Sequence, residues 1–247
     1  YQRLVKLTYL HFIDTKDKSD VSVIVDKQIK YFFYLKQLKI IFPDARFIVL
    51  SRDVRDNIVS KQNRSLNWNQ HPLFLAGLWR DSYANVSLLN ANEHCKIQYE
   101  QFVRDTVNTL TTVCNFVGLE FEEVMLETEG IYANFLDEKK NDVDPAFIKR
   151  LQSFHSGLSS KMSDSKIGQY KNALDNTVLE KVECICGFWL NKMGYEISSK
   201  KKLLGVSAIY HVTLARCYRK YLLKFYLFIP FRVKLFFKQI RKTSKNV

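Results

Sequence analysis

One short stretch, residues 42–60, constrains the fold of this chain more than any other. Within it, residues 47–50 form a continuous apolar run, which is typical of a strand buried on both faces of a parallel sheet. The run stops at residues 51–53, and a helical pattern follows. The pattern therefore predicts Arg52 at the carboxyl end of a buried strand, where open α/β sheets bind their ligands.

A hydroxyl side chain in the same stretch is predicted to face the same spot. Ser60 comes eight residues after Arg52, about two helical turns later, so it returns to nearly the same face. A guanidinium beside a hydroxyl can receive a phosphate group, because guanidinium pairs bidentately with phosphate oxygens. The structural alternative is an ion pair from Arg52 to Asp53 or Asp56.

Strand and helix patterns alternate along the chain, which predicts an α/β fold with a parallel sheet. Strands are predicted at residues 21–25, 47–50 and 95–99; helices are predicted at residues 29–41, from 54 through 60, and at 71–90, 106–117, 121–127, 145–154 and 177–193. Gly194 is placed as the glycine that ends the last of these helices.

Charge divides the chain into two parts. The net charge is +13, yet residues 1–199 hold 25 Lys/Arg and 25 Asp/Glu, whereas residues 200–247 hold 13 Lys/Arg and no acidic residue. We therefore expect a domain over residues 1–199 and a basic, aromatic tail over residues 200–247. The 5 cysteines lack metal-site spacing and the 5 histidines are scattered, so we expect no metal and favour a reducing compartment.

Residues 42–60 resemble the 3′-phosphate-binding motif of sulfotransferases that use 3′-phosphoadenosine 5′-phosphosulfate (PAPS). In that family an arginine ends a strand preceded by a Phe-Pro-Asp/Lys-Ala turn, and a serine follows eight residues later. The resemblance implies that Arg52 and Ser60 hold the 3′-phosphate. Further family segments follow in order at residues 97–103, 118–121 and 186–195, and these build the domain rather than do chemistry.

Residues 166–171, Lys-Ile-Gly-Gln-Tyr-Lys, resemble the family's Arg/Lys-x-Gly-x-Trp-Lys loop, which closes over the nucleotide. The resemblance implies that Lys166, Gly168 and Lys171 bind the cofactor, with the glycine letting backbone approach the phosphate and the lysines supplying charge. Tyr170 replaces the usual tryptophan. The alternative is an ordinary solvated surface loop.

Asp26 and Lys27 stand where the family has a Glu/Asp-Lys-Thr/Ser-Pro-x-Tyr segment. The resemblance implies that Asp26 is the general base that takes the proton of the acceptor hydroxyl, and that Lys27 faces the transferring sulfuryl group. Gln28 and Ile29 replace the Thr-Pro pair. The alternative is that Asp26 caps the following helix.

The resemblance covers about residues 20–196 and implies a three-layer α/β fold. A parallel sheet would carry helices on both faces, as in P-loop nucleoside kinases, with a C-terminal amphipathic helical tail. The implied activity is sulfuryl transfer from PAPS to a hydroxyl or amine acceptor, a carbohydrate or glycolipid, without a metal. The alternatives are a P-loop kinase of similar topology and a non-catalytic, membrane-associated sulfotransferase-like protein. Residues 1–20 do not match the family's 5′-phosphosulfate loop, so we expect an N-terminally truncated and inactive fragment, or a degenerate relative.

The tail has the pattern of a basic amphipathic helix. Basic residues fall on one predicted helical face and apolar ones on another: Arg216, Arg219, Lys220 and Lys224 against Leu214, Tyr218, Tyr221, Leu222, Phe225 and Phe228. Such a helix suits an anionic membrane surface; packing on the domain or on a second subunit is the alternative. We do not expect nucleic-acid binding, because the sequence of residues 1–199 shows no comparable basic pattern.

The compartment follows from the same tail. Its longest charge-free run, residues 225–231, is too short to span a bilayer. We expect a cytoplasmic protein that is peripheral at the membrane, or a Golgi-lumen protein if a membrane anchor precedes residue 1.

Overall fold

The computed structural model describes residues 21–64, 69–127, 163–199, 203–222 and 228–230, together with residues 7, 11, 137, 148 and 225. The chain forms two compact units, the first from residues 1–60 and 82–173 and the second from residues 61–81 and 174–247. The second unit continues across residue 200, and a functional boundary at that point stays a prediction. Two helices contribute to both units: α3 (Val54–Arg64) and α4 (Pro72–Ala84).

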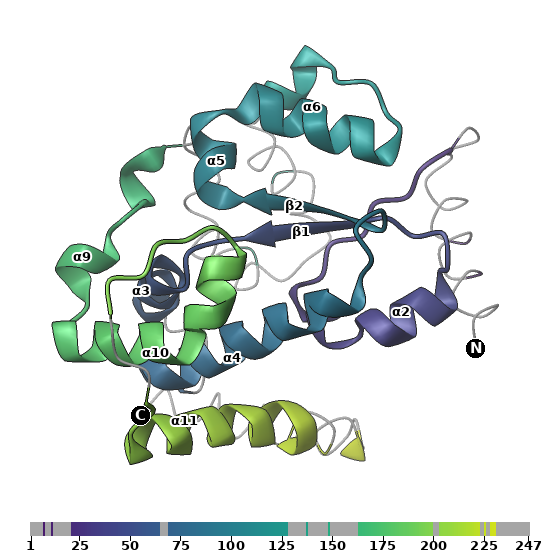
Figure 1. The fold of residues 1–247 in the computed structure, drawn as a ribbon. Coiled ribbons are helices and arrows are strands. Elements are labelled where there is room, and N and C mark those ends of the chain that lie inside the picture. Colours follow the sequence, from purple (N-terminus) through teal and green to yellow (C-terminus); the bar gives the residue numbers. More distant parts are fainter. Residues whose placement is uncertain are drawn as a thin grey trace. The chain divides into compact units, whose positions relative to one another are not determined.

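The first unit is built on two parallel strands. β1 (Phe47–Ser51) pairs with β2 (His94–Gln98), in a register that joins Phe47 to His94 and Ser51 to Gln98. Both strands therefore end at the same edge of the sheet (Figure 1). The prediction of a strand at residues 21–25 is wrong. Residues 21–28 form no regular element, because no described strand lies beside them to complete a hydrogen-bonded ladder.

Burial alternates along β1, which corrects the expectation of a strand covered on both faces. Val49 and Ser51 are buried, whereas Ile48 and Leu50 are exposed. The hydroxyl of Tyr83, near the end of α4, donates a hydrogen bond to the Leu50 carbonyl oxygen at 3.0 Å. Burial raises the pKa of Tyr83 above its ordinary range, so this hydroxyl keeps its proton.

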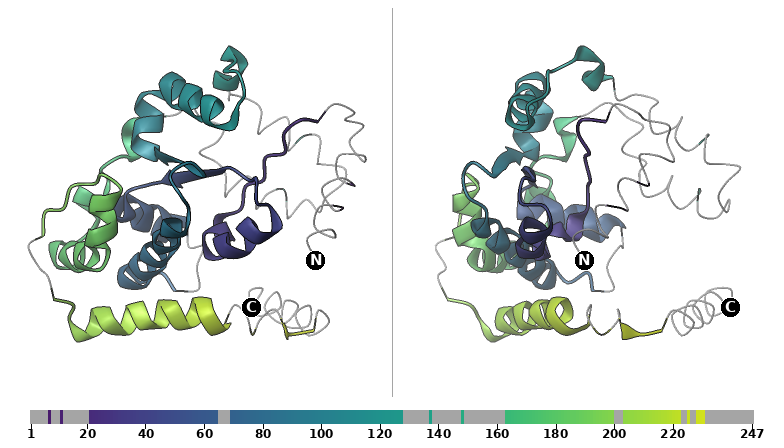
Figure 2. Two further views of the ribbon diagram at one scale, coloured as in Figure 1. Left: turned by 45° about the vertical axis from the view of Figure 1, so that its right-hand side comes forward. Right: turned by 90° about the vertical axis from the view of Figure 1, so that its right-hand side faces the viewer.

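Helices lie on both sides of the two strands (Figures 1 and 2). On one side α2 (Leu35–Ile41) follows the 3₁₀ turn η1 (Ile29–Phe33), so the predicted helix over residues 29–41 is divided at Tyr34. On the other side lie α5 (Tyr99–Arg104) and α6 (Thr106–Val117). The remaining short elements of this unit are η2 (Asn85–Leu88), η3 (Glu123–Leu126), η5 (Asp164–Lys166) and α9 (Tyr170–Ala173).

The predicted helix boundaries hold where a cap is present. Asp105 accepts a hydrogen bond from the backbone N–H of Asn108 at the start of α6, and Gly118 ends this helix in the left-handed region, at φ +78°. The predicted helix over residues 121–127 is wrong, since only the 3₁₀ turn η3 forms there. The predicted helix over residues 145–154 lies outside the described residues, except for position 148.

The second unit contains α10 (Asn176–Lys192) and α11 (Val206–Cys217), with the π-helical turn η6 (Tyr218–Leu222) and the first ten residues of α4. Asp175 begins α10 by accepting the backbone N–H of Thr177 at 2.7 Å. Gly194 follows α10 at φ +83°, which confirms the predicted helix end. The thiol of Cys186 donates to the carbonyl oxygen of Ala76, joining α10 to α4.

One face of α11 packs against α4 through small side chains. Ala208, Val212 and Ala215 are buried, and a Cβ placed on Gly77 would lie 3.1 Å from the Cβ of Ala215. The tail helix thus packs on its own unit along this face. No helix in the parts of the chain that the structure describes is long and apolar enough to cross a membrane.

Two stacked imidazoles join α4 and α11. The rings of His71 and His211 lie parallel, 3.5 Å apart between centroids, and Nδ1 of His71 accepts the backbone N–H of Leu73. Burial lowers the pKa of His71, with the neighbouring charges of His211 and Lys181 acting in the same direction, and burial also lowers the pKa of His211. Protonation is therefore disfavoured in the folded unit.

We predict that the stability of this unit falls as the pH drops. Both histidines have a lower pKa in the folded unit than the value of about 6.5 in the unfolded chain, so the unfolded chain binds more protons. The free energy of unfolding is therefore highest above about pH 6.5 and decreases as the pH falls below it. The thermal unfolding midpoint, Tm, should therefore decrease when the pH is lowered from about 7.5 to about 5.5, a range that spans the ordinary histidine pKa. His211→Gln should flatten this dependence and His94→Gln in the other unit should not; equal slopes would contradict the assignment.

Candidate functional site

The turn that follows β1 is fixed by buried charges. Arg55 Nη2 lies 2.6 Å from Asp53 Oδ2, and both side chains are less than a tenth exposed. The backbone N–H of Asp53 donates to Oε1 of Glu100 at 3.0 Å, and the Ser51 hydroxyl donates to the carbonyl oxygen of Ile97 at 3.1 Å. The end of β1 is thus attached both to β2 and to the start of α5.

Arg52 emerges from this turn at the predicted place, the carboxyl end of β1. Its guanidinium carbon lies 4.6 Å above the ring centre of Tyr99, and Nη2 donates to the carbonyl oxygen of Lys166 at 2.9 Å. Asp53 is held by Arg55, and Asp56 accepts backbone amides instead. The alternative interpretation, an ion pair from Arg52 to either carboxylate, is therefore not what the structure shows.

Asp56 holds a segment more than a hundred residues away in the sequence. Its buried carboxylate accepts the backbone N–H of Gly168 at 2.7 Å and that of Tyr170 at 3.0 Å. The guanidinium carbon of Arg55 lies 4.3 Å above the Tyr170 ring. Residues 166–170 are therefore attached to the start of α3 by a carboxylate and a cation–π contact, and they are not an ordinary solvated loop.

Gly168 gives this segment a left-handed backbone conformation. Its φ of +77° favours glycine, whereas a Cβ there would meet no atom within 4 Å. The residue is thus suited to this backbone conformation, and its approach to a phosphate stays a prediction. Its N–H donates to the Asp56 carboxylate at 2.7 Å.

Three further residues are predicted to bind the cofactor. Ser60 is half-buried and comes one turn after Asp56 on α3, so the two share a face. The side chains of Lys166 and Lys171 are exposed, Lys166 at the end of η5 and Lys171 within α9. The structure thus joins Arg52 directly to the backbone of Lys166, and the binding roles stay predictions.

Asp26 and Lys27 are exposed in the irregular segment that precedes η1. The carboxylate of Asp26 accepts a hydrogen bond from the hydroxyl of Tyr31. The position that caps η1 belongs to Gln28, so the helix-cap alternative for Asp26 does not hold. The catalytic roles of the two residues stay predictions.

Sequence reasoning gave Asp53, Arg55 and Asp56 no functional place, although all three belong to the site. The signal was present as alternating acidic and basic residues directly after a buried strand, at the edge where ligands bind. Glu100 was assigned to domain building, and it accepts a hydrogen bond from the backbone N–H of Asp53. Within the described ranges, no three His, Cys, Asp or Glu side chains gather as metal ligands do.

Comparison with known proteins points to one family. A model described as "Sulfotransferase family" matches residues 2–123. A curated relative, "Sulfotransferase 2A1" of Rattus norvegicus, is 26% identical over 144 residues, which are 52% of this chain and 50% of the relative. The chain thus spans about half the length of that relative. Residues 166–171 lie outside the matched range, and only the fold joins them to Arg52.

Two solved structures share the fold. The sulfotransferase domain of the Synechococcus PCC 7002 olefin synthase aligns with a TM-score of 0.50 and 18% identity, over 84% of this chain and 62% of that one. The sulfotransferase domain from the curacin biosynthetic pathway aligns with a TM-score of 0.54 and 19% identity, over 76% and 68%. Both therefore support the P-loop-like α/β fold expected from the sequence.

We predict that Asp56→Asn loosens residues 166–170 without unfolding α3. One amide hydrogen bond is lost, because the Asn side chain presents a single acceptor oxygen and an NH₂ group in place of two oxygens. Loss of a buried partner costs about 1–3 kcal/mol, so hydrogen exchange at Gly168 and Tyr170 should accelerate by roughly ten- to a hundredfold. Asp164→Asn, an exposed change in the same segment, is the control. Unchanged exchange in Asp56→Asn would show that the carboxylate does not hold the segment.

Proposed function

This chain belongs to the sulfotransferase family, and on that premise we propose that it moves a sulfuryl group from PAPS to a hydroxyl or amine acceptor. The acceptor we favour is a carbohydrate or a glycolipid, because the segment at Asp26 and Lys27 resembles that of glycan sulfotransferases. Membership in this family favours sulfuryl transfer over the phosphoryl transfer of a P-loop kinase.

The observation that carries the proposal is the setting of Arg52. A half-buried guanidinium stands at the carboxyl end of a parallel strand, with its plane held over Tyr99 and its edge against the Lys166 carbonyl. A pre-oriented arginine pairs with two phosphate oxygens at lower entropic cost than a mobile one. These features fit a 3′-phosphate, with the Ser60 hydroxyl as a second donor from α3.

The charges around Arg52 support the same assignment. Asp53 is neutralised by Arg55, and the carboxylate of Asp56 is satisfied by two backbone amides. These two carboxylates thus bind Arg55 and backbone amides rather than Arg52. Exposed Lys166 adds positive charge beside it, which favours an anionic nucleotide.

Bound PAPS would supply an activated sulfuryl group. The side chains of this chain would orient that group and take up the proton of the acceptor hydroxyl. Arg52 and Ser60 would anchor the nucleotide, and residues 166–171 would cover it. Asp26 would accept the proton of the acceptor hydroxyl, with Lys27 stabilising negative charge on the leaving oxygen. A cytoplasmic location, peripheral at a membrane, completes the proposal.

Calorimetric titration of the full-length protein with 3′-phosphoadenosine 5′-phosphate tests the site directly. Adenosine 5′-phosphate, which lacks the 3′-phosphate, and ATP should bind at least about tenfold more weakly, since they lose a charge-assisted contact. Equal affinities for the three nucleotides would reject the 3′-phosphate site. Absence of binding would favour the non-catalytic alternative.

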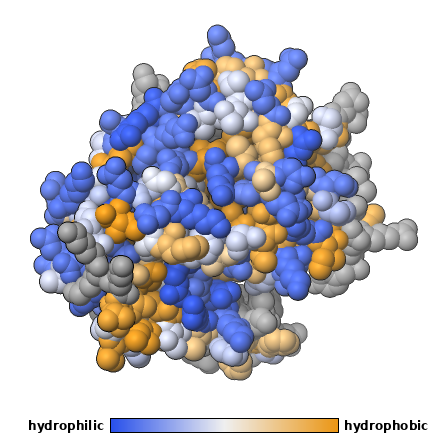
Figure 3. Space-filling view, viewed as in Figure 1, coloured by the Kyte–Doolittle hydropathy of each residue, from blue (hydrophilic) through white to orange (hydrophobic). Residues whose placement is uncertain are grey.

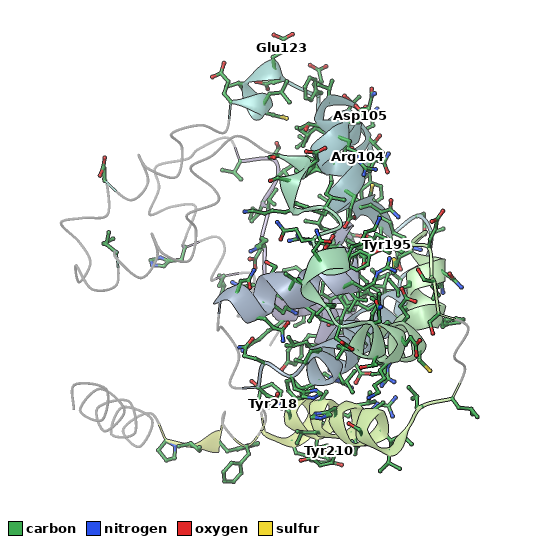
Figure 4. All side chains as sticks on the ribbon, turned by 90° about the vertical axis from the view of Figure 1, so that its left-hand side faces the viewer. Arg104, Asp105, Glu123, Tyr195, Tyr210 and Tyr218 are labelled. Carbon is green, nitrogen blue, oxygen red and sulfur yellow. The ribbon has the colours of Figure 1, made fainter. Side chains whose placement is uncertain are left out.

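Arg52→Ala should weaken the affinity for 3′-phosphoadenosine 5′-phosphate by roughly 2–4 kcal/mol, because it removes a bidentate contact to charged oxygens. The matched control is Arg104→Ala, an exposed arginine at the end of α5 in the same unit (Figure 4). This control should leave the affinity unchanged. An equal loss in both variants would point to general electrostatic attraction rather than a site at Arg52.

Asp26→Asn should lower kcat by roughly a hundredfold or more while leaving nucleotide affinity intact, because a general base contributes about 10²–10⁴ to the rate. Asp44→Asn, an exposed carboxylate of the same unit, serves as the control. Turnover of a sulfated acceptor and nucleotide titration are both measured. A variant that loses nucleotide affinity but keeps kcat would reject the base assignment.

A further inference from the structure

The C-terminal helix α11 carries apolar residues on two opposite faces. One face, with Ala208, Val212 and Ala215, is buried on α4. The other is exposed, with Val206 at 84%, Ile209 at 52% and Tyr210 at 61% of their full accessibility. The spacing of the exposed residues, at 100° per residue, places them on one side of the helix. We call this side the outer face of α11, comprising Val206, Ile209, Tyr210, Thr213 and Cys217; exposed Tyr221 follows in η6.

The outer face differs from the apolar stripe that the sequence suggested. Tyr218, which that stripe included, packs its ring on Phe74 with centroids 5.9 Å apart. Figure 4 shows Tyr210 at the outer side of α11, and in Figure 3 apolar side chains gather at the lower left, over the start of this helix. Two further apolar side chains later in the chain, Phe225 and Phe228, are also strongly exposed.

Positive charge lines one flank of the outer face. Arg216 and Lys220 precede and follow Cys217 on the exposed side, and both are exposed. Residues 200–247 contain 13 Lys/Arg and no acidic residue. The carboxylate near this helix, Asp81, is buried and lies 3.7 Å from Arg216 and 3.5 Å from Arg219. Asp81 is therefore engaged on the inner side, whereas Lys220 is exposed, with its Nζ 5.2 Å from the ring centre of Tyr221.

We propose that the outer face of α11 binds an anionic lipid bilayer, with the helix lying in the plane of the interface. Apolar side chains flanked by cations match acyl chains flanked by acidic headgroups. Tyr210 and Tyr221 suit the headgroup level, where amphipathic rings concentrate. Two copies of this face would instead bring cations together without an acidic partner, which disfavours self-association. This inference does not depend on the proposed transferase activity.

Vesicle co-sedimentation of the full-length protein tests the inference. Mixed phosphatidylserine–phosphatidylcholine vesicles should bind the protein, and vesicles of phosphatidylcholine alone should bind it far more weakly. The triple change Val206→Ser, Ile209→Ser and Tyr210→Ser should lower the partition coefficient by about tenfold or more, because it removes three apolar side chains that the bilayer would bury. Lys220→Gln should lower it by about fivefold, and added salt should act in the same direction.

The control is a double change, Ile40→Ser with Val124→Ser, which removes exposed apolar side chains from the other unit. It should leave vesicle binding unchanged. Circular dichroism confirms that each variant is folded, and Val206→Ser alone replaces the triple change if that variant is not.

Three outcomes would overturn the proposal. The first is equal binding to neutral and anionic vesicles, and the second is a triple variant that binds as tightly as the parent protein. The third is a concentration-dependent dimer, seen by sedimentation velocity, that the triple change abolishes while vesicle binding is absent. That last result would assign the outer face to a second copy of the chain.

Discussion

The buried ion pair between Asp53 and Arg55 is the interaction on which the first unit depends. It closes the turn after β1 and directs the Asp53 N–H to Glu100, so the end of β1 cannot move independently of α5. Arg55 also stacks on Tyr170. One arginine thus organises both the turn and the distant segment that lies over it. Removing one partner of such a pair leaves an uncompensated buried charge, so replacing either residue is expected to be strongly destabilising.

The first unit holds two arginines in different settings, one in a buried ion pair and one half-buried at the end of β1. Arg55 has carboxylate and aromatic partners and is buried, whereas Arg52 is half-buried with its guanidinium on Tyr99. Two arginines three residues apart therefore serve different purposes. The same holds in the tail: Arg219 lies beside Asp81, while Lys220 is exposed. Counting charges in the sequence cannot reveal this division, because it depends on which carboxylates are buried nearby.

The sequence predicted those parts of the fold that local patterns determine. The apolar run ending at Arg52 predicted β1, and the glycines at 118 and 194 predicted helix ends that the structure confirms. The apolar run at residues 21–25 led to a wrong strand prediction. A strand also needs a neighbouring strand to pair with, and a local sequence pattern does not show whether one is present. Asp56 was missed for a similar reason: its partners lie 112 and 114 residues away, and only the fold brings them together.

The contact between α4 and α11 has a consequence for sequence variation in related chains. At Gly77 an added methyl group would come within 3.1 Å of the Ala215 side chain and 3.3 Å of the Val212 backbone, so a side chain at 77 would require the neighbouring helix to shift. The volumes of the side chains at 77 and 215 should therefore covary: a chain with alanine at 77 is expected to carry glycine at 215. Such a coupled pair would keep α11 in the same rotation about its axis on α4. The same positions would then face outward even when the amino acids at positions 77 and 215 change.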